Sequence, residues 1–342
     1  MVAFAEHQIQ IALRLILSPG DTVYDVGANK GWLSEPISRI VGISGHVVCF
    51  EPSPRNLIEL TDLISRGLSN CTIVNAAVYR KTGDGINLYQ NNFSNADSIY
   101  INEQNSPTVV VNTLALDDYL GHTGYVPKVM KFDIEGAEYD ALLGARELVE
   151  NIMPILVLET RSDDSRPFIF LKNRGYRAYN LMSYEELVHE GDVQAGRYVD
   201  DHIYLPPEFK DSIFTRKKSD EVTREFDNNG RDIVLKVDLM AGLNCVKIWG
   251  EGQGDPYDVL IVEATMGGRI VVNTSDQLKF MFSPHFASVI YAPSPGCATY
   301  RLRRALSDFS ISKLSVQTVP MTPAEHQRQK ILSVIAPFGL PL

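Results

Sequence analysis

Two acidic residues stand near the ends of short apolar runs in the first part of the chain. Asp25 lies in TVYDV and is followed by Gly27, Asn29 and Gly31, whereas Glu51 closes HVVCFE. Glycine lets the backbone turn sharply and approach a ligand closely. A carboxylate at the first strand end, with a second about 20 residues later, is typical of folds that bind a ribose-containing ligand. The spacing therefore predicts a nucleoside site.

The glycine pattern departs from the plain dinucleotide fingerprint G-x-G-x-x-G. That fingerprint would require glycine at positions 29 and 32, where Asn29 and Trp32 stand. The departure weakens a pyrophosphate-binding interpretation. A nicotinamide-dependent oxidoreductase is therefore the weaker enzyme alternative.

A second group of acids follows later strand-like runs. Asp133 and Glu135 come directly after KVMKF, and Glu159 closes PILVLE. Such acids can orient or deprotonate a hydroxyl group, or Asp133 and Glu159 can hold a divalent cation such as Mg²⁺ or Mn²⁺. Acids beside a helix start also serve as caps and dipole partners, which is the alternative for Glu135 and Glu138. We take Asp133, Glu135 and Glu159 as the candidate catalytic residues.

The elements that would position these acids alternate between strand and helix. Strand-like runs are expected at 22–26, 46–51, 71–75, 128–133, 154–159, 176–181 and 202–206, with helices from about 32, from about 54, over 136–149 and near 168–174. This alternation is typical of parallel βαβ units. It predicts an α/β domain with a doubly wound, mostly parallel sheet. A further amphipathic helix is expected over 5–16.

The later part of the chain has a different pattern. Residues 210–229 are rich in charged and polar side chains, and short strand-like runs separated by turn residues follow them. These features predict a linker at 210–229 and an all-β, sandwich-like or jelly-roll-like domain over 230–342, after a first domain over 1–209.

Composition limits the partners and the compartment. The net charge of −10 argues against affinity for nucleic acid or acidic membranes, and 44% hydrophobic residues are typical of a globular protein. The four cysteines are scattered without metal-site spacing, and no secretory leader is recognised, so we expect a reducing, cytoplasmic location. The expected partner is a small-molecule or glycan acceptor, and homo-oligomer formation is left open.

The segments DVGANKG, FEPSPRN and KFDIEGAEYDAL together resemble the FkbM family of S-adenosylmethionine-dependent O-methyltransferases. The resemblance covers about residues 15–206 and implies a class I methyltransferase fold of the Rossmann-like type, with Asp133 opposite the sulfonium. It further implies contacts to the methionine part from Asp25, Gly27, Asn29 and Gly31, to the ribose from Glu51, and to the adenine from Asn75 and Ala76.

We therefore expect a methyltransferase that uses S-adenosylmethionine and acts on a hydroxyl of a glycan, a sugar-containing metabolite or another secondary metabolite. The alternative from another class is a noncatalytic protein that binds a sugar or a partner and uses the domain as a scaffold. His202 is a reserve candidate for a base. The polar segment 93–98 is a candidate cover for the cofactor or the substrate.

Overall fold

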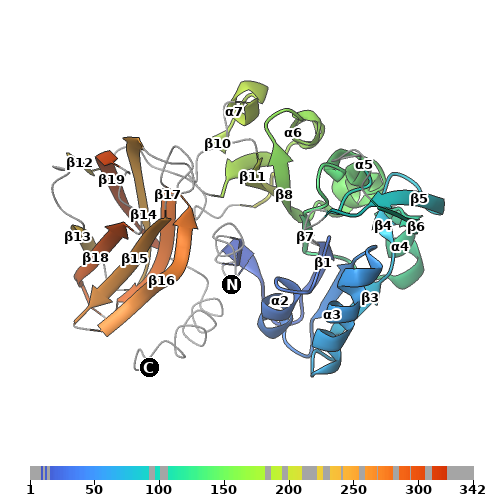
Figure 1. Ribbon diagram of the computed structural model, residues 1–342, viewed down its shortest axis with the longest axis horizontal. Helices are drawn as coiled ribbons and strands as arrows, with labels where there is room; N and C mark the ends of the chain where they lie inside the picture. Colours follow the sequence, from blue (N-terminus) through green and yellow to red (C-terminus); the bar gives the residue numbers. More distant parts are fainter. Residues whose placement is uncertain are drawn as a thin grey trace. The chain divides into compact units, whose positions relative to one another are not determined.

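The structure is a computed structural model, and the chain divides into two compact units. It describes residues 9–10, 12–13, 16–91, 97–100, 107–181, 186–194, 199–209, 222–225, 232–239, 242–253, 259–267, 269–279, 285–292, 294–304 and 310–321. The first unit comprises 16–181 with 186–209, and the second contains the strands from 222 to 321 (Figure 1). The domain limits expected from the sequence stay a prediction.

The first unit is built on an eight-stranded sheet in the order β10-β9-β11-β8-β7-β1-β2-β3. Strands β3, β2, β1, β7 and β8 are parallel, whereas β11 pairs antiparallel with both β8 and β9. The strands are β1 (Thr22–Val26), β2 (His46–Phe50), β3 (Cys71–Val74), β7 (Val129–Phe132), β8 (Ile155–Arg161), β9 (Arg177–Asn180), β10 (Glu186–Leu187) and β11 (Val199–Leu205). The expected mostly parallel sheet is confirmed.

The strand order reverses between β1 and β7, which both lie in the middle of the sheet. In open α/β sheets, ligands bind outside the carboxyl ends of the strands at such a reversal. Asp25 and Asp133 stand at the carboxyl ends of these two strands. The topology therefore brings the two acidic groups of the sequence to one edge.

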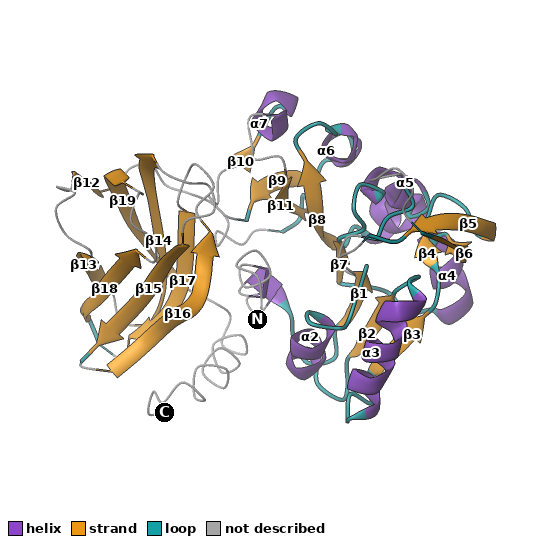
Figure 2. Ribbon diagram, viewed as in Figure 1, coloured by secondary structure: helices purple, strands orange, loops and turns teal. Residues whose placement is uncertain are grey.

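Helices connect these strands (Figure 2). They are α2 (Ser34–Val41), α3 (Pro54–Ser65), α4 (Leu116–Thr123), α5 (Glu138–Leu143), α6 (Arg166–Lys172) and α7 (Glu190–Gln194). Proline at the first position of α3 suits a helix start because its missing N–H is not needed there. The core of the unit contains the large buried side chains of Tyr24, Phe50 and Phe132.

The single helix expected over 136–149 is replaced by two shorter pieces. Helix α5 ends at Leu143, and a π-helical turn spans Leu148–Ile152. A Cβ at Gly144 would lie 2.2 Å from the carbonyl oxygen of Tyr79, so only glycine permits this close backbone approach. The break therefore reflects tertiary packing.

A small separate sheet in the order β4-β6-β5 was not among the elements expected from the sequence. Its strands are β4 (Ala77–Val78), β5 (Gly83–Tyr89) and β6 (Thr108–Leu114).

At the N-terminus, the described residues of the expected helix 5–16 are helical, and Ile9, Ala12, Leu13 and Ile16 are buried; Ala5 lies outside the described residues.

Every regular element described from 222 to 321 is a strand, and the strands form two four-stranded antiparallel sheets. One sheet has the order β12-β19-β14-β17 and the other β13-β18-β15-β16. The strands are β12 (Val222–Glu225), β13 (Asp232–Leu239), β14 (Gly242–Gln253), β15 (Val259–Met266), β16 (Arg269–Lys279), β17 (His285–Ala292), β18 (Gly296–Arg304) and β19 (Ser310–Met321). Strand β12 lies inside the interval expected as linker and pairs with β19. The sandwich arrangement stays a prediction.

Candidate functional site

The turn after β1 is shaped by two glycines with positive φ. At Gly27, φ is 82°, and a Cβ there would lie 1.9 Å from the backbone oxygen of Asp133. At Gly31, φ is 84°, and a Cβ would lie 2.6 Å and 2.8 Å from side-chain carbons of Leu63 and Leu60. Gly27 therefore requires glycine for conformation and for space, whereas the backbone conformation is what favours glycine at Gly31. The close approach at Gly27 also places this turn directly against the acidic segment after β7.

Asp25 and Asn29 present buried oxygen atoms toward this turn without hydrogen-bond partners among the described residues. Asp25 is 1% exposed, and its Oδ2 accepts a bond of 2.5 Å from the Ser34 hydroxyl, whereas its Oδ1 accepts no hydrogen bond and lies 4.0 Å from the ammonium group of Lys131. The Oδ1 of Asn29, a residue with φ 50°, also accepts no hydrogen bond. Buried polar atoms of this kind are costly unless a ligand or water satisfies them. They mark a place where a ligand with donor groups would fit.

Glu51 connects this turn to the start of α3. Its Oε2 accepts a bond of 2.8 Å from the Asn29 N–H, and its Oε1 accepts one of 2.8 Å from the Ser53 N–H. Burial raises the pKa of Glu51, and these backbone bonds oppose the rise. Oε1 also accepts a longer bond of 3.4 Å from Asn56 Nδ2, so Oε2 is the oxygen with a further lone pair to which a ribose hydroxyl could donate.

The residues expected beside the adenine follow the neighbouring strand. Glu51 N–H donates to the carbonyl of Val74 at 3.1 Å, so the end of β3 lies beside Glu51. Asn75 follows β3 and is exposed, whereas Ala76 is buried. Their location at the same sheet edge agrees with the expected adenine contacts, which stay a prediction.

Asp133, Glu135 and Glu159 meet at the carboxyl ends of β7 and β8. One carboxylate oxygen from each lies within 4.8 Å of those of the other two. Asp201 on β11 stands directly across from Glu159 in the antiparallel register, so the two side chains share a sheet face. We did not expect Asp201 from the sequence. A signal was present, because two aspartates precede the expected strand 202–206.

The cluster of acids raises the pKa of its own members. Burial, followed by the charges of Asp133 and Glu135, raises the pKa of Glu159 well above its ordinary value. Burial raises the pKa of Glu135 from 4.5 to about 7, with Asp133 and Glu138 adding to the rise. An acid with a pKa near neutrality can exchange protons under physiological conditions. The same oxygen-rich geometry can hold a hard divalent cation.

Lys131 is the buried cation that faces these acids. It is 5% exposed, and its Nζ lies 3.0 Å from Asp133 Oδ2 and 4.0 Å from Asp25 Oδ1. Burial lowers the pKa of Lys131, but the charges of Asp133 and Asp25 outweigh burial and raise it. Lys131 is therefore protonated at neutral pH, and its ammonium group links the two acidic sides of the site.

His202 does not lie with the acids. It pairs with Leu158 in the register of β11 and β8, so its side chain is on the face opposite to Asp201 and Glu159. His202 is 2% exposed, and burial lowers its pKa to about 3. This placement excludes His202 as the reserve base for the acidic cluster.

The polar segment 93–98 is described only at Asp97 and Ser98, and its remaining residues lie outside the described part of the chain. Asp97 Oδ2 accepts bonds from the Ser53 hydroxyl at 2.8 Å and from Arg55 Nε at 3.0 Å. Ser98 donates to the carbonyl of Glu135 at 2.9 Å. The described end of the segment thus contacts both sides of the site, whereas its expected covering role stays a prediction.

A family model described as the methyltransferase FkbM domain matches residues 25–178. No curated protein sequence matches the chain. In the described part of the chain, no helix has the length and apolar character needed to cross a membrane.

Several solved structures are similar to part of the chain. Methyltransferase FkbM from Methylobacillus flagellatus KT has a TM-score of 0.39 and 18% identity, over 55% of this chain and 44% of that one. Aeropyrum pernix fibrillarin, in complex with natively bound S-adenosyl-L-methionine, has a TM-score of 0.36 and 14% identity, over 58% and 73%. Precorrin-6y C5,15-methyltransferase from Geobacter metallireducens GS-15 has a TM-score of 0.35 and 15% identity, over 58% of this chain and 86% of that one. The first match spans less than half of that structure's length.

Proposed function

We propose that the chain is an S-adenosylmethionine-dependent O-methyltransferase, because a family model described as the methyltransferase FkbM domain matches residues 25–178. Its acceptor is a hydroxyl of a glycan, a sugar-containing metabolite or another secondary metabolite. The observation that carries the proposal is the meeting of two different groups at one sheet edge. Two buried oxygens without hydrogen bonds, Asp25 Oδ1 and Asn29 Oδ1, belong to a glycine turn, and a cluster of acids stands against that turn.

The residues around the turn fit the cofactor. Asp25 Oδ1 and Asn29 Oδ1 would accept bonds from the donor groups of its methionine part, and Glu51 would accept bonds from the ribose hydroxyls. Gly27 and Gly31 keep the backbone close to the ligand. When bound, the cofactor supplies an electrophilic methyl group on a positively charged sulfur.

The acidic cluster fits the acceptor side. Gly27 and Asp133 are in backbone contact, so a ligand held above the turn lies beside the carboxylates. Asp133 would orient the acceptor hydroxyl, and Glu135 or Glu159 would accept its proton as the oxygen is methylated. Lys131 keeps Asp133 next to the cofactor side.

We propose the version in which these carboxylates act directly. The second version places Mg²⁺ or Mn²⁺ on Asp133 and Glu159, and the oxygens that converge within 4.8 Å favour it. A cation would acidify the hydroxyl, so that water could accept its proton in place of a carboxylate base. Chelation separates the two versions, as described in the Discussion.

Other parts of the proposal rest on the sequence. The strands from 222 to 321 are proposed to form a sandwich. The cytoplasmic location is supported by Cys49, Cys71 and Cys297, which are free. The acidic net charge supports an acceptor other than nucleic acid.

Two experiments test the proposed function. Calorimetry should show that S-adenosylmethionine and S-adenosylhomocysteine bind at micromolar strength while NAD does not; equal binding of NAD would overturn the cofactor assignment. Cells with and without the protein should then be grown on methionine with a deuterated methyl group. Mass spectrometry should find a metabolite that carries the labelled methyl only when the protein is present. Binding of the cofactor without any labelled product would favour the noncatalytic alternative.

A further inference from the structure

The turn that carries Glu135 has an unusual backbone. Glu135 has φ 55°, and Gly136 after it has φ 97°. A left-handed conformation is ordinary for glycine but unfavourable for glutamate. Such a conformation persists where neighbouring contacts hold it, and it is often found at functional sites. The contacts around Glu135 therefore bear on the direction of its carboxylate.

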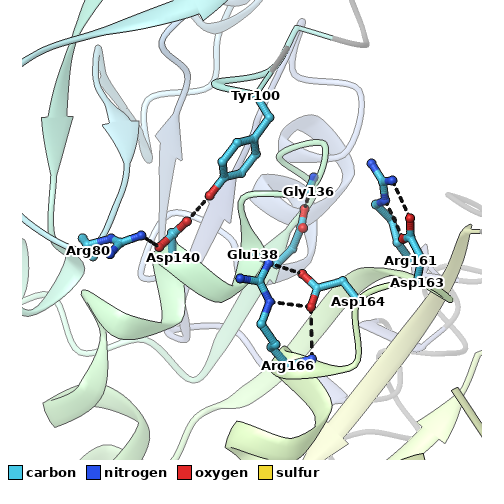
Figure 3. A network of polar contacts seen from close by, with 9 residues as sticks. All are labelled: Arg80, Tyr100, Gly136, Glu138, Asp140, Arg161, Asp163, Asp164 and Arg166. Carbon is cyan, nitrogen blue, oxygen red and sulfur yellow. Dashed lines mark hydrogen bonds and ion pairs between the residues drawn. The ribbon is translucent and has the colours of Figure 1, made fainter. Parts of the chain in front are cut away.

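One set of contacts comes from helix α5. Glu138 Oε1 accepts bonds from the Ile134 N–H at 3.0 Å and from the Gly136 N–H at 3.3 Å. Figure 3 shows the second of these bonds within the surrounding polar network. Glu138 thus satisfies the N–H groups on both sides of Glu135, and it leaves the Glu135 carbonyl to another donor.

Ser98 supplies that donor from a distant part of the sequence. Its hydroxyl donates to the Glu135 carbonyl at 2.9 Å and accepts a bond of 3.0 Å from the Tyr100 N–H. Because the Tyr100 N–H occupies a lone pair, the hydroxyl proton is directed toward Glu135. Ser98 is 0% exposed, so water does not compete for this bond.

The backbone of Ser98 is itself fixed. It exchanges two hydrogen bonds with Tyr89 at the end of β5, of 2.7 Å and 3.1 Å. Two residues later, the Tyr100 hydroxyl donates to Asp140 on α5, which also pairs with Arg80 (Figure 3). Ser98 therefore acts from a rigid support on the turn that carries Glu135.

We propose that Ser98 is a positioning residue for methyl transfer, which holds Glu135 in its left-handed conformation so that its carboxylate stays beside Asp133 and Glu159. This inference rests on the proposed function. Without the hydroxyl, the Glu135 carbonyl loses its bond and the backbone can relax to a right-handed conformation. The carboxylate would then leave the cluster, while the cofactor turn, which Ser98 does not contact through this bond, would remain.

The test compares Ser98→Ala with Ser38→Ala. Ser38 is also buried and donates to Asn70 at 2.5 Å, but it lies on α2 and has no contact with the acids described here. Methyl transfer is measured with labelled S-adenosylmethionine and, as the acceptor source, an extract of cells that lack the protein. We expect kcat of Ser98→Ala to fall about ten- to a hundredfold, with KM for S-adenosylmethionine within about twofold of wild type. Ser38→Ala should lose thermal stability but keep kcat.

Conservative variants separate positioning from folding. Ser98→Thr keeps the hydroxyl and should restore most of kcat, whereas Ser98→Cys fills the space with a weaker donor and should stay folded with a reduced kcat. Equal kcat in Ser98→Cys and wild type, or a loss of cofactor affinity that accounts for the lower rate, would overturn the inference. If wild type itself transfers no methyl group while binding the cofactor, the proposed function fails first and the inference fails with it.

Discussion

The carboxylates on the two sides of the candidate site have different surroundings. On the cofactor side, both Glu51 oxygens accept backbone hydrogen bonds that fix the adjoining turns. On the acceptor side, Asp133, Glu135 and Glu159 face one another, and burial, followed by the charges of neighbouring acids, raises the pKa of Glu135 and Glu159. The first arrangement favours rigid binding, whereas the second favours proton exchange or cation binding. Variants on the two sides should therefore have different effects.

The largest separation is expected from Asp133→Asn. The substitution keeps the size of the side chain and removes the charge that pairs with Lys131. Methyl transfer should fall about a hundredfold or more, while the affinity for S-adenosylhomocysteine should stay within about threefold. Rate measurements and calorimetry on the same preparation test this. Unchanged turnover would refute a catalytic role for Asp133 in either version.

The same assay decides between direct action and a metal. If the cluster holds a cation, EDTA should abolish activity, Mg²⁺ or Mn²⁺ should restore it, and Glu159→Gln should share the defect of Asp133→Asn. If the carboxylates act directly, chelation should have no effect.

The opposite pattern is expected on the cofactor side. Asp25→Ala or Glu51→Ala removes hydrogen bonds to the ligand and should weaken S-adenosylhomocysteine binding by about 1–3 kcal/mol each. Asp62→Ala, on the exposed surface of α3, is the matched control and should bind as wild type does. Full affinity in both site variants would show that the ligand binds elsewhere.

The acceptor side should also make folding depend on pH. Burial raises the pKa of Glu138 from 4.5 to about 7, so between these values the folded state keeps a proton that the unfolded chain releases. The free energy of unfolding should therefore fall by about 1–3 kcal/mol as pH rises through this window. Below the window, the stabilising contribution of the protonated Glu138 is complete. Urea titrations at several pH values should give a shallower dependence for Glu138→Gln. The exposed Glu147→Gln should leave the dependence unchanged.

The smallest effect is expected from removing the strands after 222. A chain cut near Ser219 separates residues 1–210 from the strands after 222, and all the site residues lie in the first piece. This piece should bind S-adenosylhomocysteine within about threefold of the full chain. An insoluble piece, or one without affinity, would mean that the second unit stabilises the first.

The sequence predicted the parts of the site that follow directly from strand ends. Asp25, Glu51 and Asp133 each stand at or next to the end of a strand in the parallel part of the sheet, and Glu159 lies two residues before the end of β8 at Arg161, so βαβ alternation was enough to place them near one edge. A sharp backbone turn at Gly27 and Gly31 was likewise expected from residue type, and both residues have positive φ.

The rest depends on tertiary pairing that no local pattern reveals. Asp201 joins the acids because β11 inserts antiparallel beside β8, and a shift of one residue would have placed His202 there. Ser98 reaches Glu135 through a small sheet whose strands β4 and β6 were not predicted. The break at Gly144 comes from a backbone contact with Tyr79.

The contact between Gly27 and the Asp133 carbonyl also constrains engineering of this domain. A Cβ at Gly27 would lie 1.9 Å from the backbone oxygen of Asp133, so the two turns pack against each other through main-chain atoms. Grafting the β1 turn from another protein would therefore succeed only if the segment after β7 came with it. The turn after β1 and the segment after β7 would therefore have to be exchanged together, although more than a hundred residues separate them along the chain.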